Sequence, residues 1–129
     1  MQRVLDVDAG AAVHVLGAVG DVVGAVRTTL NSLVAEARDL TPDDTAPFDE
    51  FHIRGREATV ELAARLNLQA GQRVLDVGCG LGGPSRHLAW TYGCRVSGID
   101  LTAPYCEAAG LIAETEERLR QAQKMETVG

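Results

Sequence analysis

One stretch near the middle of the chain restricts its possible folds more than any other. Residues 73–77, Arg-Val-Leu-Asp-Val, form a short β-favouring run that leads directly into the glycine-rich run 78–83. Pro84 suits the first position of a helix, because its missing N–H needs no partner there. A second run typical of a strand follows at residues 94–100. Together these runs predict a strand, a glycine turn, a helix and a second strand, and hence the α/β fold class.

Helices are predicted on both sides of this unit. Apolar residues recur at steps of three and four along the amino-terminal part, and residues 25–38 favour a helix most strongly. Residues 41–47 contain two prolines and predict a loop or a helix entry, whereas residues 53–68 predict an amphipathic helix. Thr102 is suited to cap a further helix, and the polar residues after Gly110 predict a solvated helix or a coiled-coil arm.

The charge balance and the cysteine count argue against several classes of protein. Among 129 residues, 12 basic and 18 acidic side chains give a net charge of −6, and only 4% of residues are aromatic. We therefore expect no nucleic acid as a partner. Three well-separated cysteines provide neither a disulfide framework nor a metal site, which favours a reducing cytoplasm. Residues 9–26 are apolar-rich but carry charge and four glycines, so we expect no signal peptide and no membrane span.

The sequence contains one internal repeat. Residues 2–7 match residues 72–77 letter for letter, but the first copy lacks the glycine turn that follows the second. Either each copy is simply a short strand, or the chain carries a partial duplication. We assign no second binding site to the first copy.

The glycine turn is the strongest candidate for a binding site. Glycines let a ligand approach the backbone closely, and the helix that follows directs its free N–H groups at that ligand. The pattern Gly78-x-Gly80-x-x-Gly83 formally matches a dinucleotide-binding fingerprint, with Asp100 about 20 residues on as the ribose-binding acid. Asp76, however, would repel a pyrophosphate and attract an ammonium and a sulfonium group. S-adenosylmethionine (SAM) carries both groups and no phosphate, and its ribose suits Asp100.

Three segments carry a resemblance to a known family. Residues 74–89 resemble the first motif of class I SAM-dependent methyltransferases, and residues 98–102 resemble their second-strand motif. Residues 48–59 resemble the lead-in of the small-molecule branch of that family. The resemblance implies the amino-terminal part of a Rossmann-like SAM-binding fold, with flanking helices and an incomplete sheet. It implies methyl transfer from SAM to a small-molecule acceptor by a truncated domain, and the missing strands place the activity in question.

The resemblance also implies which residues bind the cofactor: Asp76, Gly78, Cys79, Gly80, Asp100 and Leu101. Asp76 would lie near the amino end of the methionine part, and the turn residues would line that part with their backbone. Asp100 would accept hydrogen bonds from the ribose hydroxyls, and Leu101 would pack on the adenine. Simpler interpretations stay open, in which Asp76 only caps a turn, Asp100 only ends a strand and Cys79 is only a small residue that fits the turn.

No catalytic base is identified from the sequence. His52 and His87 are the nearest titratable candidates. His52 lies in the lead-in segment, where it is placed to help cover the site. For His87 an ordinary structural role in its helix is favoured.

Two other functions and several partners stay open. Residues 117–129 resemble the segment that precedes the dimerisation helix of two-component sensor histidine kinases. One alternative function is a non-enzymatic helical module that self-associates through its terminal helices. The other is a βαβ unit that binds NAD or another nucleotide at the glycine pattern. We expect a homo-oligomer that completes the sheet or pairs tail helices. The chain divides into an amino-terminal helical segment, a partial SAM-binding methyltransferase domain and a charged helical tail: residues 1–40, 41–109 and 110–129.

Overall fold

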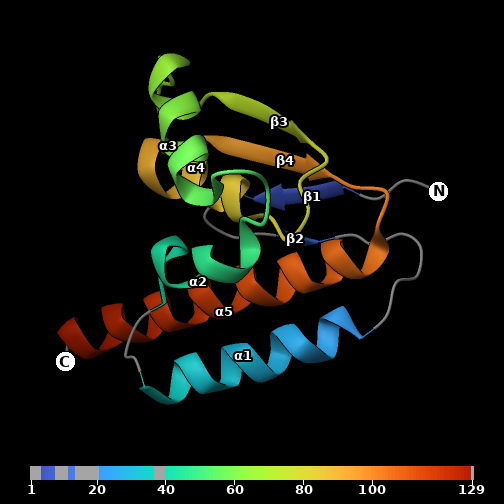
Figure 1. The fold of residues 1–129 in the computed structure, drawn as a ribbon. Helices are drawn as coiled ribbons and strands as arrows, with labels where there is room; N and C mark the ends of the chain where they lie inside the picture. The colour runs from blue at the N-terminus through green and yellow to red at the C-terminus, as the bar shows by residue number, and fades with distance from the viewer. Residues whose placement is uncertain (1–3, 8–11, 14–20, 37–39, 129) are drawn as a thin grey trace.

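The chain forms a small sheet with helices packed around it, as Figure 1 shows for a computed structural model that describes residues 4–7, 12–13, 21–36 and 40–128. The elements in chain order are β1 (Val4–Val7), β2 (Ala12–Val13), α1 (Val22–Glu36), α2 (Pro42–Asp49), α3 (Gly55–Arg65), β3 (Arg73–Val77), α4 (Gly83–Tyr92), β4 (Arg95–Ile99) and α5 (Ala103–Val128). The predicted α/β class is confirmed. The strand, turn, helix and strand predicted in the middle of the chain correspond to β3, α4 and β4.

The sheet has the strand order β2-β1-β4-β3. β3 and β4 are parallel, with Val74 opposite Val96. β1 lies on the other side of β4 and is antiparallel to it, with Val4 opposite Ile99. The two copies of the repeated hexapeptide therefore contribute strands to opposite sides of β4. The amino-terminal segment, which the sequence predicted as helical, contributes two strands as well as α1.

Local signals set the ends of the helices. Thr41 precedes α2, and its N–H donates to the Asp44 carboxylate at 2.8 Å in a capping box. α3 is shorter than predicted, because Arg54 before it and Asn67 after it both have positive φ. α4 ends at Gly93 in the left-handed conformation. α1 covers residues 25–36 of the helix predicted over 25–38 and begins at Val22, whereas residues 37–38 lie outside the described residues.

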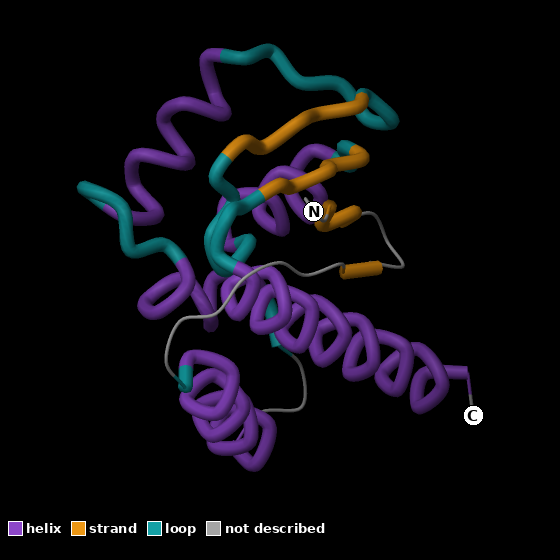
Figure 2. Tube along the Cα trace, turned by 90° about the vertical axis from the view of Figure 1, so that its right-hand side faces the viewer, coloured by secondary structure: helices purple, strands orange, loops and turns teal. Residues whose placement is uncertain are grey.

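α5 is one continuous helix of 26 residues that begins just after the sheet. Its first half is buried, with Ala108 and Ile112 packed against Val26 and Leu30 of α1. Figure 2 shows α5 passing below the strands, with α1 beside it. The boundary expected at residue 110 falls inside this helix, so the part predicted to be solvated is in its first turns a core element.

The open edge of the sheet lies at β3. In the part of the chain that the structure describes, β3 pairs with β4 and with no other strand. Leu75 and Val77 of β3 are 61% and 72% exposed. β3 is therefore an open edge of the sheet with two exposed apolar side chains, and the predicted incompleteness of the sheet stays a prediction. No helix among the described residues has the length and apolar character needed to cross a membrane.

Candidate functional site

The glycine turn leaves β3 at the end of the sheet where β4 also ends. Gly78, Gly80 and Gly82 all have positive φ, of 75°, 55° and 78°, which residues with a Cβ rarely adopt. The N–H groups of Gly78 and Cys79 donate to the Ile99 carbonyl at 2.8 and 3.0 Å, so the turn is tied to β4. A Cβ added at Gly78 would meet no atom within 4 Å. One side of the turn is therefore open to a ligand.

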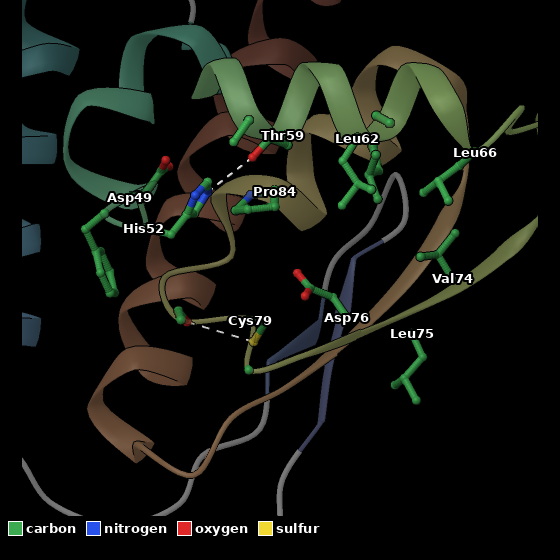
Figure 3. Close-up of a pocket in the computed structure, with 16 residues that line it drawn as sticks. Asp49, His52, Thr59, Leu62, Leu66, Val74, Leu75, Asp76, Cys79 and Pro84 are labelled. Atoms are coloured by element: carbon green, nitrogen blue, oxygen red, sulfur yellow. Dashed lines mark hydrogen bonds between the residues drawn. The ribbon is translucent and has the colours of Figure 1, made fainter. Parts of the chain in front are cut away.

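A cavity of about 460 Å³ lies beside this turn, between α3 and β3. Figure 3 shows Val74 and Asp76 on the side of β3 that faces α3, whereas Leu75 points away from it. Leu62 of α3 and Leu66, the residue that follows α3, lie on the opposite wall. The cavity thus has a long apolar part and, at the turn, a carboxylate.

Asp76 is the predicted site residue whose charged group lines this cavity. One of its carboxylate oxygens accepts a hydrogen bond from the Ser85 hydroxyl at 2.6 Å. Ser85 is itself fully buried in the first turn of α4, so this contact fixes Asp76 against the helix that follows the turn. The other oxygen has capacity for a ligand.

Asp100 contacts the backbone of the glycine turn outside the cavity wall. Its two oxygens accept hydrogen bonds from the Gly80 N–H at 2.8 Å and from the Thr102 N–H at 2.7 Å. The carboxylate therefore connects the turn with the start of α5, and it is not part of the cavity wall. Leu101 is 84% exposed and also lies outside that wall. The structure thus brings Asp76, Gly78, Cys79 and Gly80 together at the cavity, with Asp100 adjacent and Leu101 apart.

Cys79 is a buried part of the turn. Burial, with smaller effects from Cys106, Asp76 and Asp100, raises the pKa of the Cys79 thiol far above its ordinary value. A thiol in such surroundings stays protonated at neutral pH and is a poor nucleophile. These features favour the interpretation that Cys79 is a small residue that fits the turn. In the described part of the chain, no group of three or more His, Cys, Asp or Glu side chains is placed to hold a metal ion.

His52 lies at the rim of the cavity, between α2 and α3. Its Nε2 is 3.2 Å from the Thr59 hydroxyl, which donates to the buried Glu50 carboxylate at 2.5 Å. Arg56 pairs with the same carboxylate at 2.9 Å. Sequence reasoning identified His52 but not Glu50, because nothing in the local pattern indicates that this carboxylate is buried. His87, by contrast, is buried in α4 and does not line the cavity.

Phe51 covers the turn on the side of α2. Its ring lies so close to Gly80 that a Cβ there would be 3.3 Å from the Phe51 Cζ. The ring also packs edge-on against Tyr105 of α5, with 5.6 Å between the ring centres. The turn is therefore bounded by an aromatic ring on one side and open at Gly78 on the other.

A buried arginine, which sequence reasoning did not single out, connects the turn with two helices. Arg86 donates to the Leu81 carbonyl at 2.7 Å, and its guanidinium pairs with the carboxylate of Asp49. Its Nε is 3.4 Å from a carboxylate oxygen of Glu116 in α5. These partners lie 37 and 30 residues away in the sequence, so no local motif indicates the cluster.

Comparison with known proteins decides the family. Residues 53–126 match the sequence profile of the family described as "Mycolic acid cyclopropane synthetase". The chain belongs to this family. The resemblance to class I SAM-dependent methyltransferases is thereby confirmed. The cyclopropane synthetase match includes most of the charged tail, and the likeness of that tail to sensor histidine kinases stays a prediction.

Several curated enzymes are similar to parts of this cyclopropane synthetase family member. Phosphoethanolamine N-methyltransferase 1 of Zea mays is 54% identical over 48 residues, which is 37% of this chain and 10% of that enzyme. The methyltransferase GfsG of Streptomyces halstedii is 38% identical over 66 residues, or 51% of this chain and 24% of that enzyme. The chain thus spans only 10% to 25% of the length of such relatives.

Two solved structures are also similar in part. A SAM-dependent methyltransferase from Geobacter sulfurreducens in complex with S-adenosyl-L-homocysteine is 30% identical, with a TM-score of 0.46. The match covers 66% of this chain and 35% of that one. Phosphoethanolamine N-methyltransferase 2 of Haemonchus contortus in complex with SAM is 31% identical, with a TM-score of 0.43, over 50% of this chain and 14% of that one.

Proposed function

We propose that this chain binds SAM at the glycine turn and takes part in methyl transfer to a small-molecule acceptor. The observation that carries the proposal is the Asp76 carboxylate in the cavity wall, next to a turn whose Gly78 is open. Membership in the cyclopropane synthetase family supports it, as do relatives whose names give methyl transfer as their activity.

The residues around the cavity fit a cationic nucleoside better than a dinucleotide. The described residues that line the cavity include Asp49 and Asp76, and none of them is Lys or Arg. A pyrophosphate would meet two carboxylates there, whereas an ammonium or a sulfonium would be attracted. The fit favours SAM over NAD.

Each residue has a proposed part in binding. Asp76 would hold the ammonium group, and the backbone of Gly78 and Gly80 would line the methionine part. Asp100 would accept from the ribose hydroxyls with the lone pairs that its two backbone partners leave free. The Leu101 side chain is exposed, so it would pack on the adenine only when bound SAM or a partner chain covers it.

The protein's contribution to the chemistry would be to position the reactants and exclude water. Bound SAM supplies an electrophilic methyl group on its sulfonium. The apolar wall of Leu62 and Leu66 would exclude water from an acceptor in line with that group. His52, at the rim, is the imidazole among the residues that line the cavity. The names of relatives, phosphoethanolamine and sterol methyltransferases, support a small-molecule acceptor.

The three free cysteines support a reducing compartment such as the cytoplasm.

The open sheet edge supports a second proposal, that the chain associates through β3. Leu75 and Val77 are large apolar side chains at an edge whose N–H and C=O groups have no strand partner among the described residues. Association at this edge would complete the sheet, and it would leave the cavity between α3 and β3 in place.

A ligand comparison by thermal denaturation tests the main proposal. SAM and S-adenosylhomocysteine should raise the unfolding temperature of the wild type, and NAD should not. The rise should be lost in Asp76→Asn and retained in Glu107→Gln, which removes the same charge from an exposed position of α5. Stabilisation by NAD alone would show that the turn binds a dinucleotide. Transfer of a labelled methyl group from SAM to candidate acceptors then tests activity.

A further inference from the structure

The buried Arg86 joins three parts of the molecule that meet at the glycine turn. The side chain is only 2% exposed. It holds the Leu81 carbonyl within the turn, the Asp49 carboxylate at the end of α2 and the Glu116 carboxylate in α5. A guanidinium with three acceptors from three places fixes their relative positions.

Asp49 is the member of this cluster that lines the cavity. Its carboxylate lines the cavity wall, and Oδ1 has no hydrogen-bond partner although it is buried. The same carboxylate lies against Gly83, where a Cβ would collide with it. The end of α2 is therefore packed tightly against the end of the glycine turn. A change of charge in the cluster changes the electrostatic potential in the cavity, because Asp49 lines its wall.

The cluster contains two carboxylates and a single guanidinium. Burial raises the pKa of Glu116 from 4.5 to about 7, because desolvation outweighs the attraction of Arg86 and Arg120. Asp49, on α2, adds to this rise, and its own pKa is also raised by burial. Ionisation of Glu116 near neutral pH therefore makes the charge of the cluster more negative by one unit.

We propose that Arg86 is a positioning residue for the glycine turn, and that ionisation of Glu116 strengthens the binding of a cationic nucleoside in the cavity. The inference rests on the proposed function. A sulfonium in the cavity lies on the Asp49 side of the cluster and is attracted by its negative form. By linkage, the same cation favours the ionised form of Glu116.

The charge of the ligand separates this effect from other pH effects. SAM carries a methyl group and a positive charge on its sulfur that S-adenosylhomocysteine lacks, while the rest of the two molecules is the same. The ratio of their affinities therefore reports the field that the cluster exerts at the sulfur. We expect this ratio to rise in favour of SAM by about threefold to tenfold as the pH increases from about 6 to about 8.

Titration calorimetry with both ligands at several pH values tests the linkage. The rise should be present in the wild type and in Glu114→Gln, an exposed position on the same helix, and absent in Glu116→Gln. An equal rise in Glu116→Gln would overturn the inference while leaving the proposed function intact. Absence of heat with both ligands, on folded protein, would overturn the proposed function and this inference with it.

Arg86→Lys tests the positioning role, because it keeps the charge but not the planar set of donors. We expect both ligands to bind on the order of tenfold more weakly, since the turn loses the anchor at Leu81. The affinity ratio should still rise with pH, because Glu116 still titrates. Unchanged affinity in a folded Arg86→Lys protein, judged by circular dichroism, would contradict the positioning role.

Discussion

At the scale of single residues, Asp76 and Asp100 leave the same end of the sheet but contact different groups. Asp76 is fixed by one hydroxyl and faces the cavity, so most of its charge is available to a ligand. Asp100 accepts from two backbone N–H groups, so it holds the turn itself. The first residue is therefore expected to govern which ligand binds, and the second to govern whether the turn has the right shape.

Replacement of Asp100 by alanine tests the second statement. The Gly80 and Thr102 N–H groups lose their acceptor, which we expect to lower the free energy of unfolding by about 1–3 kcal/mol. Binding of S-adenosylhomocysteine should be lost as well, since Gly80 and Thr102 are no longer held together by the carboxylate between the turn and the start of α5. Urea denaturation and calorimetry measure the two effects. A variant with wild-type affinity would show that the turn does not depend on Asp100.

Replacement of Gly80 by valine tests the geometry of the turn. The new Cβ would be 3.3 Å from Phe51, and the backbone has a φ of 55°. A left-handed conformation costs a residue with a Cβ about 1–2 kcal/mol, and more for a branched one. We expect weaker cofactor binding together with this loss of stability. Gly71→Val is the control, since Gly71 also has positive φ but has no atom near its Cβ position and lies outside the cavity wall. Equal loss of affinity in both variants would contradict the account.

At the scale of elements, the contact of α5 with α4 makes stability depend on pH. The pKa of Glu116 is about 7 in the folded chain and 4.5 in the unfolded chain. Between these pH values the Glu116 carboxyl is therefore protonated in the folded state and ionised in the unfolded state. Stability present at low pH is therefore lost as the pH rises from about 4.5 through about 7, by about 3 kcal/mol. Asp49, whose pKa is also raised, acts in the same direction.

Denaturant unfolding of the wild type and Glu116→Gln across this range checks the expectation. The wild type should lose stability as the pH rises, and the variant should lose clearly less. Glu114→Gln should behave as the wild type. A wild-type stability that increases over the same interval would mean that Glu116 is not buried as described.

The elements that the sequence predicted well are those with local signals at both ends. β3, β4 and the start of α4 were predicted within one residue, because the glycine turn marks the end of β3 and Pro84 marks the start of the helix. The buried first half of α5 was not predicted. Its inner face is built from alanines and one isoleucine among charged residues, which gives a weak hydrophobic signal.

The site divides in the same way. Asp76, Gly78 and Gly80, which were predicted from residue type and spacing, lie together at the cavity, and their part in binding stays a prediction. The cluster of Asp49, Arg86 and Glu116 was not identified, because contacts between residues so far apart in the sequence depend on how the helices pack. The exposure of Leu101 was not foreseen either, since it depends on what covers the end of the sheet.

At the scale of the whole molecule, the sheet ends in the two-residue strand β2 on one side and in the longer strand β3 on the other. The amino-terminal copy of the repeated hexapeptide pairs with β4, while its second copy, in β3, leaves one edge free in the described part of the chain. Exposed strand edges with large apolar side chains favour pairing with another chain. Self-association would then involve β3 and leave β1 in place.

A charged edge tests this interpretation. Leu75→Lys should lower the tendency to associate, because a lysine on an edge strand opposes pairing. Light scattering over a range of concentrations should show oligomers for the wild type and mostly monomer for the variant. Val60→Lys, on an exposed position of α3, is the control and should associate as the wild type. A wild type that stays monomeric throughout would contradict association through β3.

The central claim is that the acidic end of β3 selects a cationic, phosphate-free nucleoside. Calorimetric titration of the folded wild type and of Asp76→Asn with SAM tests it most directly. The account predicts a binding heat for the wild type and a loss of affinity of about tenfold or more in the variant, which corresponds to about 1.4 kcal/mol or more. Equal affinity for SAM in the two proteins would contradict it.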